Sequence, residues 1–272
     1  MLCMHSMKLG RETTVKRGHA RTALDRLAVG VLLIAAWQGT SMATGEYWIA
    51  GPWSTVARLV ALAADGQLGM HAAYTLRSAV TGFAIGFLPG LMLPFLLRRS
   101  PILTAIIEPY MMAGYGIPKL ALAPLFILWF GIGIESKIAV VAIVTFFLVY
   151  YNTAAGVRAL DVRLVRMAQV AGASEAQVAR KIVWPTAAPY ILAGVRISTP
   201  YAIGGAVIAE LISSNRGLGY LVQLGAANFD TKTVFAALAA TTVIVLGANW
   251  LVGAAERYFL RWRPAAGPLG GV

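Results

Sequence analysis

The side chains that usually carry chemistry are few in this sequence, and they lie far apart. Cys3 is the single cysteine, so the chain cannot form an internal disulfide or a metal site built from several cysteines. His5, His19 and His71 are widely separated and have no cluster of carboxylates beside them, so we interpret each as an ordinary surface residue. The sequence contains no P-loop and no dinucleotide-binding glycine motif. We therefore expect no catalytic site, no bound cofactor and no bound metal in this chain.

The composition is that of an integral membrane protein. Hydrophobic residues make up 58% of the 272 residues, only 12% are charged, and the mean hydropathy is +0.71. A water-soluble globule with this composition would have too little polar surface to cover itself. Several apolar runs reach the roughly 20 residues that cross a bilayer as a helix, and none alternates as barrel strands do. We expect an all-α, polytopic membrane protein.

The net charge of +12 is explained by where the basic residues lie. Sixteen of the 23 lysines and arginines fall in four segments that alternate with nearly uncharged spans. This is the positive-inside pattern of cytoplasmic loops and tails, so no nucleic-acid partner is needed to account for the charge. The four groups are Lys8 to Arg26, Arg98 with Arg99, Arg158 to Lys181, and Arg257 to Arg263.

Six spans with both termini in the cytoplasm fit this charge pattern at every loop. Residues 1–23 are expected to form a cytoplasmic segment, 24–263 the transmembrane domain and 264–272 a flexible tail. We expect the first span to be retained rather than cleaved as a signal, because its apolar run is long enough to cross the membrane. The third span is interrupted by Pro109, Pro118 and Pro124 and is expected to be kinked. The expected spans are 24–43, 72–97, 101–130, 137–157, 187–212 and 233–255, with an amphipathic segment, 54–64, on the external surface.

Three glycines in the second span have a spacing that lets helices approach closely. Gly82, Gly86 and Gly90 recur every four residues, which allows two backbones to come together in lipid. The stripe could serve packing within one chain or contact between two copies of the chain.

A few ionisable residues lie within apolar stretches, where they are functional candidates by default. Glu108 and Lys119 are in the third span, although water or lipid headgroups can solvate both if they lie near the membrane surface. We favour this surface interpretation for Glu108. The external end of the fifth span offers candidates for a solute pathway, against the alternative of a plain surface turn; these are Glu210, Ser213, Asn215 and Arg216.

The only large cytoplasmic loop that this topology predicts is mostly polar and basic. It extends from Arg158 toward Gly194, and we call residues 158–186 the basic loop. A helix expected at about 161–171 is basic on one side and apolar on the other, so it could place an apolar edge in the groove of a partner. The alternative is a helix that lies on anionic lipid headgroups.

The rest of the basic loop predicts a corner and a second helix. Gly172 is followed by two small residues, which favours a tight turn. Ser174 and Gln177 have the spacing of a capping box, so a helix is expected to begin at Glu175. That helix is expected to stop before Pro185. An ordered corner and a capped helix favour a protein partner over a lipid surface.

At these residues the chain resembles a known family. The basic loop is similar to the EAA loop of the membrane subunits of bacterial binding-protein-dependent ABC importers, a pattern of E-A-A, three residues, Gly, nine residues, Ile, one residue and Leu-Pro. Arg166, Met167 and Trp184 depart from that pattern, at the positions of the glutamate, the first alanine and the leucine. The resemblance implies that the following residues couple the chain to an ATPase: Leu164, Arg166, Met167, Ala168, Ala171, Gly172, Ala173, Ser174, Ile182 and Pro185.

The resemblance covers roughly residues 72–263 and is strongest to the permeases of the nitrate, sulfonate and taurine import group. It is carried also by residues 118–137, by the run that ends at Asn152, and by residues 209–223 and 255–263. It implies a type I importer fold in the bacterial inner membrane, surrounded by lipid. The implied partners are a second permease copy, two cytoplasmic ATPase subunits that hold ATP and Mg, and a periplasmic solute-binding protein, with no nucleic acid. The implied cargo is a small organic or inorganic anion such as a sulfonate, taurine or nitrate.

Two other classes of function remain as alternatives. Hydropathy alone is compatible with an ATP-independent secondary transporter or channel, but the spans lack an acidic or basic relay through their middle. A membrane-embedded enzyme is less well supported, because no constellation of histidine, cysteine or carboxylate faces a shared site.

Overall fold

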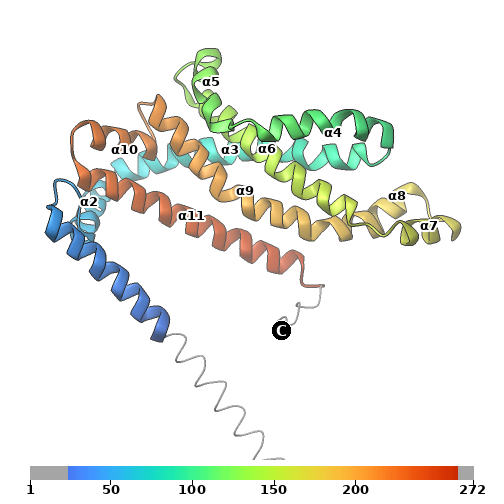
Figure 1. Cartoon of the computed structure of the whole chain (residues 1–272), viewed down its shortest axis with the longest axis horizontal. Helices are drawn as coiled ribbons and strands as arrows, with labels where there is room; N and C mark the ends of the chain where they lie inside the picture. The colour runs from blue at the N-terminus through green and yellow to red at the C-terminus, as the bar shows by residue number, and fades with distance from the viewer. Residues whose placement is uncertain (1–23, 263–272) are drawn as a thin grey trace, which may run out of the picture.

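The computed structural model describes residues 24–262, so the predicted cytoplasmic segment 1–23 and the predicted tail 264–272 lie outside the described residues. All regular elements in this part are helices, as expected (Figure 1). In chain order they are the helix Leu24–Thr44, α2 (Pro52–Ala64), α3 (Gln67–Leu97), α4 (Pro101–Gly116), the 3₁₀ helix η1 (Lys119–Leu122), α5 (Ala123–Phe130), α6 (Ile134–Arg158), α7 (Val162–Val170), α8 (Glu175–Val178), the π helix η2 (Ala179–Val183), α9 (Trp184–Ile212), α10 (Leu218–Ala227) and α11 (Thr231–Phe259).

The structure has five to six candidate spans, against the six that the sequence predicts. Five helices are long and apolar enough to cross a membrane, and α4 with η1 and α5, which are bent by 80° at the break between them, give the sixth when they are counted as one span. The break falls at Ile117, whose backbone is extended, directly before Pro118. A residue that precedes proline is driven out of the α region by the proline ring, so the predicted kink of the third span has a local cause.

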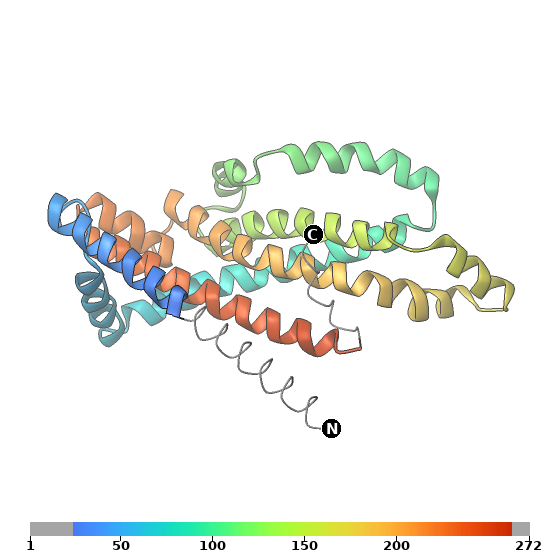
Figure 2. The same ribbon diagram turned by 60° about the horizontal axis from the view of Figure 1, so that its bottom comes forward.

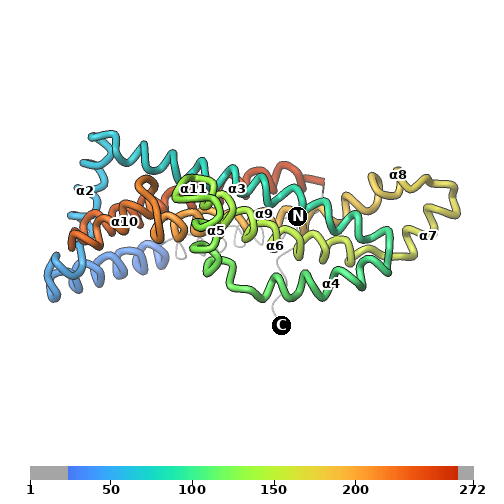
Figure 3. Tube along the Cα trace, turned by 90° about the horizontal axis from the view of Figure 1, so that it is seen from above, coloured from blue at the N-terminus to red at the C-terminus, as the bar shows by residue number. Residues whose placement is uncertain are grey.

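The centre of the bundle is α6, which packs between α3 and α9 (Figures 1 and 3). The glycine stripe of α3 faces α6 within the same chain. A Cβ at Gly82 would lie 2.6 Å from the Cβ of Val141, and one at Gly86 would lie 2.2 Å from the carbonyl oxygen of Ala142. The stripe therefore serves packing inside this chain, which decides between the two alternatives.

The helix Leu24–Thr44 lies at the edge of the bundle and diverges from it toward its own N-terminus (Figure 1); in Figure 2 it overlaps α11. It is held near its other end, where the indole of Trp37 stacks on Phe235 at 5.8 Å and donates a hydrogen bond to the carbonyl of Ala50 at 3.0 Å. Only 6% of its most apolar stretch is buried in the chain. Most of this helix is thus available to lipid or to another protein.

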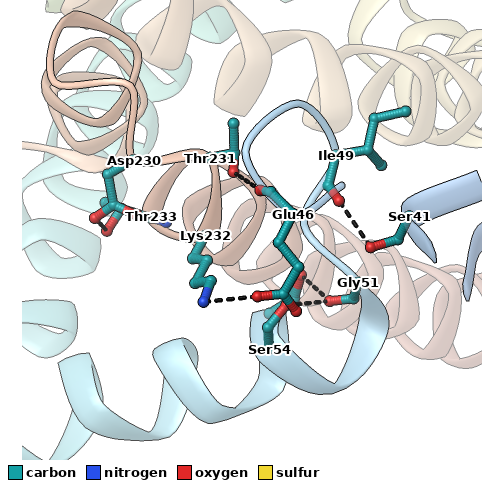
Figure 4. A network of polar contacts seen from close by, with 10 residues as sticks. Ser41, Glu46, Ile49, Gly51, Ser54, Asp230, Thr231, Lys232 and Thr233 are labelled. Carbon is teal, nitrogen blue, oxygen red and sulfur yellow. Dashed lines mark hydrogen bonds and ion pairs between the residues drawn. The ribbon is translucent and has the colours of Figure 1, made fainter. Parts of the chain in front are cut away.

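A polar network fixes the loop between this helix and α2 to the start of α11 (Figure 4). The ammonium of Lys232 lies 2.7 Å from the carboxylate of Glu46, and Thr231 donates to the carbonyl of Glu46 at 2.7 Å. The hydrogen bond from Lys232 holds the pKa of the exposed Glu46 carboxyl below its ordinary value. Ser41 closes the loop by donating to the carbonyl of Ile49 at 2.8 Å.

The segment 213–232, between α9 and α11, contains α10. A turn precedes the helix up to Gly217, and Gly219 lies inside the helix. A Cβ at Gly219 would lie 2.2 Å from the carbonyl oxygen of Val207, so this glycine allows α10 to pack against α9. Leu218 and Leu221 are buried and anchor α10 on α11.

The prediction that the second helix of the basic loop stops before Pro185 is wrong. The chain continues from α8 through the π helix η2 into α9 without a break, and Pro185 lies in the first turn of α9. The wider π turn accommodates the proline, which has no backbone N–H to donate. Thr186 donates its hydroxyl to the carbonyl of Ile182 at 2.7 Å and so satisfies a carbonyl of this irregular turn.

Candidate functional site

The first helix of the basic loop is bounded by residues that set its ends. Asp161 caps the N-terminus of α7 by accepting a hydrogen bond from the backbone of Arg163 at 2.8 Å. At the C-terminus, the N–H of Gly172 donates to Gln169 and that of Ala173 to Ala168, both at 2.9 Å. This is a Schellman motif. Gly172 has a φ of +84°, which glycine adopts without the cost of a Cβ, so the predicted corner is confirmed.

The predicted capping box at the start of α8 is also confirmed. The hydroxyl of Ser174 accepts a hydrogen bond from the N–H of Gln177 at 3.3 Å, and the Gln177 side chain accepts one from the N–H of Ser174 at 2.8 Å. Gln169 at the end of α7 donates to the carboxylate of Glu175 at 2.8 Å. The corner between α7 and α8 is therefore held from both sides.

The helix α7 lies at one end of the molecule (Figure 1), and several of its apolar side chains are exposed. Leu164 is 53% exposed, Met167 is 68% exposed and Val170 is 90% exposed. The first two are predicted coupling residues, and Val170 is a third exposed apolar side chain that was not among the predicted ones. Arg166 is exposed on the same helix and forms no ion pair with residues 24–262.

Five of the predicted coupling residues meet around one pocket between α7 and η2. Its volume is about 290 Å³. The other predicted coupling residues, which are Leu164, Arg166, Met167, Ser174 and Pro185, do not line this pocket. The lining consists of Ala168, Ala171, Gly172, Ala173 and Ile182 with Gln177, Val178 and Lys181.

The basic loop is continuous with α6 and α9, and its side chains contact α3 and α4. Arg98, next to the end of α3, lies 3.8 Å from the carboxylate of Glu175, and Phe95 of α3 stacks on Trp184 at 5.6 Å. Arg158, at the end of α6, lies 2.6 Å from Glu108 of α4. Both members of that last pair are more than 40% exposed, which agrees with the interpretation of Glu108 as a surface residue. A displacement of the loop would thus reach α3, α4, α6 and α9 directly.

A second polar cluster lies at the opposite end of α9, and Glu210 is at its centre. Its side chain is fully buried. One carboxylate oxygen accepts hydrogen bonds from the hydroxyl of Thr75 and the N–H of Gly219, both at 2.9 Å. The other oxygen has no hydrogen-bond partner within the described part of the chain.

Residues from α3 and α6 complete this cluster. His71 is 5% exposed, so its interpretation as a surface residue is wrong; its Nδ1 accepts the N–H of Gly217 at 3.0 Å. Thr75 accepts the N–H of Leu218 at 2.9 Å. Lys137 donates to the carbonyls of Ile132, at 2.6 Å, and Ser213. The sequence does carry a signal that His71 and Thr75 act together. They are four residues apart, which places both on one face of α3.

The four predicted pathway residues are close in sequence but differ in environment. Glu210 is buried, Ser213 is half-buried, and Asn215 and Arg216 are exposed. The backbone of Ser213 and Gly217 is held by the polar cluster, so the turn that carries Asn215 and Arg216 is fastened at both ends. Within residues 24–262, no three His, Cys, Asp or Glu side chains are placed to share a metal ion.

Comparison with known proteins places this arrangement in one family. Residues 82–261 match the family described as "Binding-protein-dependent transport system inner membrane component". The chain is 34% identical to the riboflavin transport system permease protein RibX of Chloroflexus aurantiacus, over 85% of this chain and 87% of that protein. It is 34% identical to the putative aliphatic sulfonates transport permease protein SsuC of Bacillus subtilis, over 87% of each.

The fold agrees with this placement. A crystal structure of an amino acid ABC transporter with histidines superposes with a TM-score of 0.61 at 20% identity, covering 74% of this chain and 97% of that chain. The chain therefore matches in fold as well as in sequence, and the fold is that of a type I importer permease. This chain therefore belongs to the family of inner-membrane components of binding-protein-dependent transport systems.

Proposed function

We propose that this chain is the membrane-spanning subunit of an ATP-driven importer in which the basic loop receives the motion of a cytoplasmic ATPase. The observation that carries this proposal is the construction of the loop. An exposed apolar face on α7 precedes a corner that is fixed by a Schellman motif and a capping box, and the corner is tied to α3 and α9. Such a loop can bind a partner and pass on its displacement as a rigid unit.

The proposed assembly contains two copies of this chain, two ATPase subunits and a periplasmic binding protein. The ATPase subunits hold ATP and Mg, and this chain binds neither. In this arrangement the basic loop and both termini are cytoplasmic, and the Glu210 cluster lies at the periplasmic end. Binding of ATP draws the two basic loops together and opens the spans toward the binding protein, and hydrolysis returns them.

The proposed cargo is a small organic or inorganic anion such as a sulfonate, taurine or nitrate. The two relatives are named for riboflavin and for aliphatic sulfonates, so membership of the family leaves a range of cargo. The coupling role assigned to Leu164, Met167 and Val170 does not depend on which of these solutes is carried.

The proposal is tested by purifying the tagged full-length chain with an ATPase and a binding protein encoded beside it and placing the complex in vesicles. We expect the ATPase to co-purify with the chain. We also expect the vesicles to take up the solute that the binding protein retains, and this uptake should require ATP on the side of the membrane where the ATPase lies. Uptake that continues without ATP and without the ATPase would favour the secondary transporter instead.

A further inference from the structure

A cavity of about 660 Å³ lies at the break in the third span. It is within the roughly 300–1,000 Å³ range of small-molecule sites. One wall is the break itself, residues 115–120, and the others come from α6 and α9. The predicted pathway residues Glu210, Ser213, Asn215 and Arg216 do not line it, and neither do the residues of the basic loop.

Lys119 is the only charged residue in the lining of this cavity. Its ammonium donates to the carbonyls of Tyr115 and Ile117, the latter at 3.3 Å, which the end of α4 leaves without helical partners. An ammonium has three N–H donors, so one remains. No carboxylate lines the cavity, and Lys119 forms no ion pair with residues 24–262. Its positive charge is therefore not neutralised by the described part of the chain.

The remaining walls of the cavity are aromatic and aliphatic. The ammonium of Lys119 lies 4.5 Å from the centroid of the Tyr115 ring and 4.9 Å from that of Phe147. On the side of α9, a Cβ added at Gly204 would meet no atom within 4 Å, so the glycine leaves the space open. The lining is completed by Val144, Leu148, Pro200, Tyr201 and Ile208 with Gly116, Pro118, Leu120 and Gly205.

We propose that this cavity binds a small amphiphilic monoanion within the membrane-spanning part of the chain. Lys119 binds the sulfonate or carboxylate group, and the aromatic and aliphatic walls contact an apolar body. A bare inorganic anion such as nitrate would leave most of these walls without a contact, and a cation would be repelled by Lys119. This inference adds a binding site to the proposed import function. It rests on that function only where it identifies the bound anion as cargo.

A purely structural role for Lys119, as a clamp on the last carbonyls of α4, is the competing explanation. Two substitutions separate the roles. Lys119→Met removes the charge and the clamp together, whereas Gly204→Leu fills the cavity from the opposite wall and leaves the clamp intact. Gly247→Leu is the matched control, because Gly247 also has no atom within 4 Å of an added Cβ but lies on α11, outside the lining.

The test uses the full-length chain with its ATPase in lipid nanodiscs and radiolabelled benzenesulfonate as the probe, without the binding protein. We expect saturable binding that nitrate and phenyltrimethylammonium do not displace. Loss of a charge-assisted hydrogen bond weakens binding by about tenfold or more, and we expect this for Lys119→Met. Gly204→Leu should weaken binding to a similar degree, and Gly247→Leu should bind as the unsubstituted chain does.

The outcomes distinguish this inference from the proposed function. If benzenesulfonate does not bind, or if Gly204→Leu binds it unchanged, the cavity is not an anion site, whether or not ATP drives uptake. If both substitutions weaken binding but uptake needs no ATPase, the cavity is a binding site and the proposed import function falls. If Lys119→Met fails to assemble, the comparison of benzenesulfonate binding by Gly204→Leu and Gly247→Leu tests the inference alone.

Discussion

At the scale of single residues, the buried carboxylate of Glu210 fixes the turn that follows α9. Glu210 is fully buried, and its hydrogen bonds reach Thr75 on α3 and the backbone of α10. A buried carboxylate is expensive to leave without partners, so these contacts hold the turn 213–217 against α3. Thr75 is the hub, because its hydroxyl donates to Glu210 and accepts the N–H of Leu218.

Thr75→Val should therefore destabilise the folded chain. The substitution keeps the shape of the side chain, removes one of the two hydrogen bonds to the Glu210 carboxylate and leaves the buried N–H of Leu218 without its partner, which costs about 1–3 kcal/mol. Thr242→Val is the control, because the exposed Thr242 hydroxyl bonds only to the carbonyl of Leu238 in its own helix. Thermal unfolding of both purified variants in detergent measures the difference. Equal melting temperatures would mean that the cluster does not stabilise the fold.

At the scale of helices, close contact between α3 and α6 fixes the centre of the bundle. Gly86→Ala should weaken this contact, since the added Cβ would lie 2.2 Å from the carbonyl oxygen of Ala142 and the two helices would have to separate. Overpacking of this kind costs about 1–3 kcal/mol. Gly69→Ala is a control on the same helix, with no atom within 4 Å, and should be neutral or slightly stabilising. Comparable losses of stability in the two variants would contradict this packing.

Asp230, at the start of α11, makes the stability of the folded chain depend on pH. Burial by itself would raise the pKa of the Asp230 carboxyl, but hydrogen bonds from Thr233 and the charge of Arg58 bring the pKa below its ordinary value. A group whose folded pKa is lowered stabilises the fold above its unfolded pKa, about 3.9, and loses that effect as the pH falls through the folded pKa. We expect the melting temperature to fall less below pH 4 in Asp230→Asn than in the unsubstituted chain. Parallel curves would show that the carboxyl contributes nothing.

The sequence predicts those helices whose ends carry local signals. The Asp161 cap, the glycine at 172 and the Ser174 capping box set α7 and α8 through contacts between near neighbours, and each was predictable for that reason. The π helix before Pro185 was not, because it depends on how one turn relaxes around the ring. The burial of His71 and the close packing of Gly219 depend on tertiary contacts with α10 and α9, which local spacing does not report.

At the scale of the whole molecule, the basic loop and the Glu210 cluster lie at the two ends of α9. The loop is joined to α3 through Phe95 and Trp184, and the cluster is joined to α3 through Thr75 and His71. Helices that are fixed to one another at both ends move as a unit. In the proposed importer, a displacement of the basic loop by the ATPase therefore also displaces the Glu210 cluster at the far end of the bundle.

The most direct test of this account is ATP-driven uptake by vesicles that contain the complete complex with Gly172→Glu. Gly66→Glu is the matched control, because Gly66 also has a positive φ, +72°, and open space around an added Cβ, but it lies between α2 and α3. We predict that both variants insert and assemble in equal amounts, that Gly172→Glu abolishes uptake, and that Gly66→Glu retains it. Uptake by Gly172→Glu at the rate of the unsubstituted complex would contradict the coupling role of the basic loop.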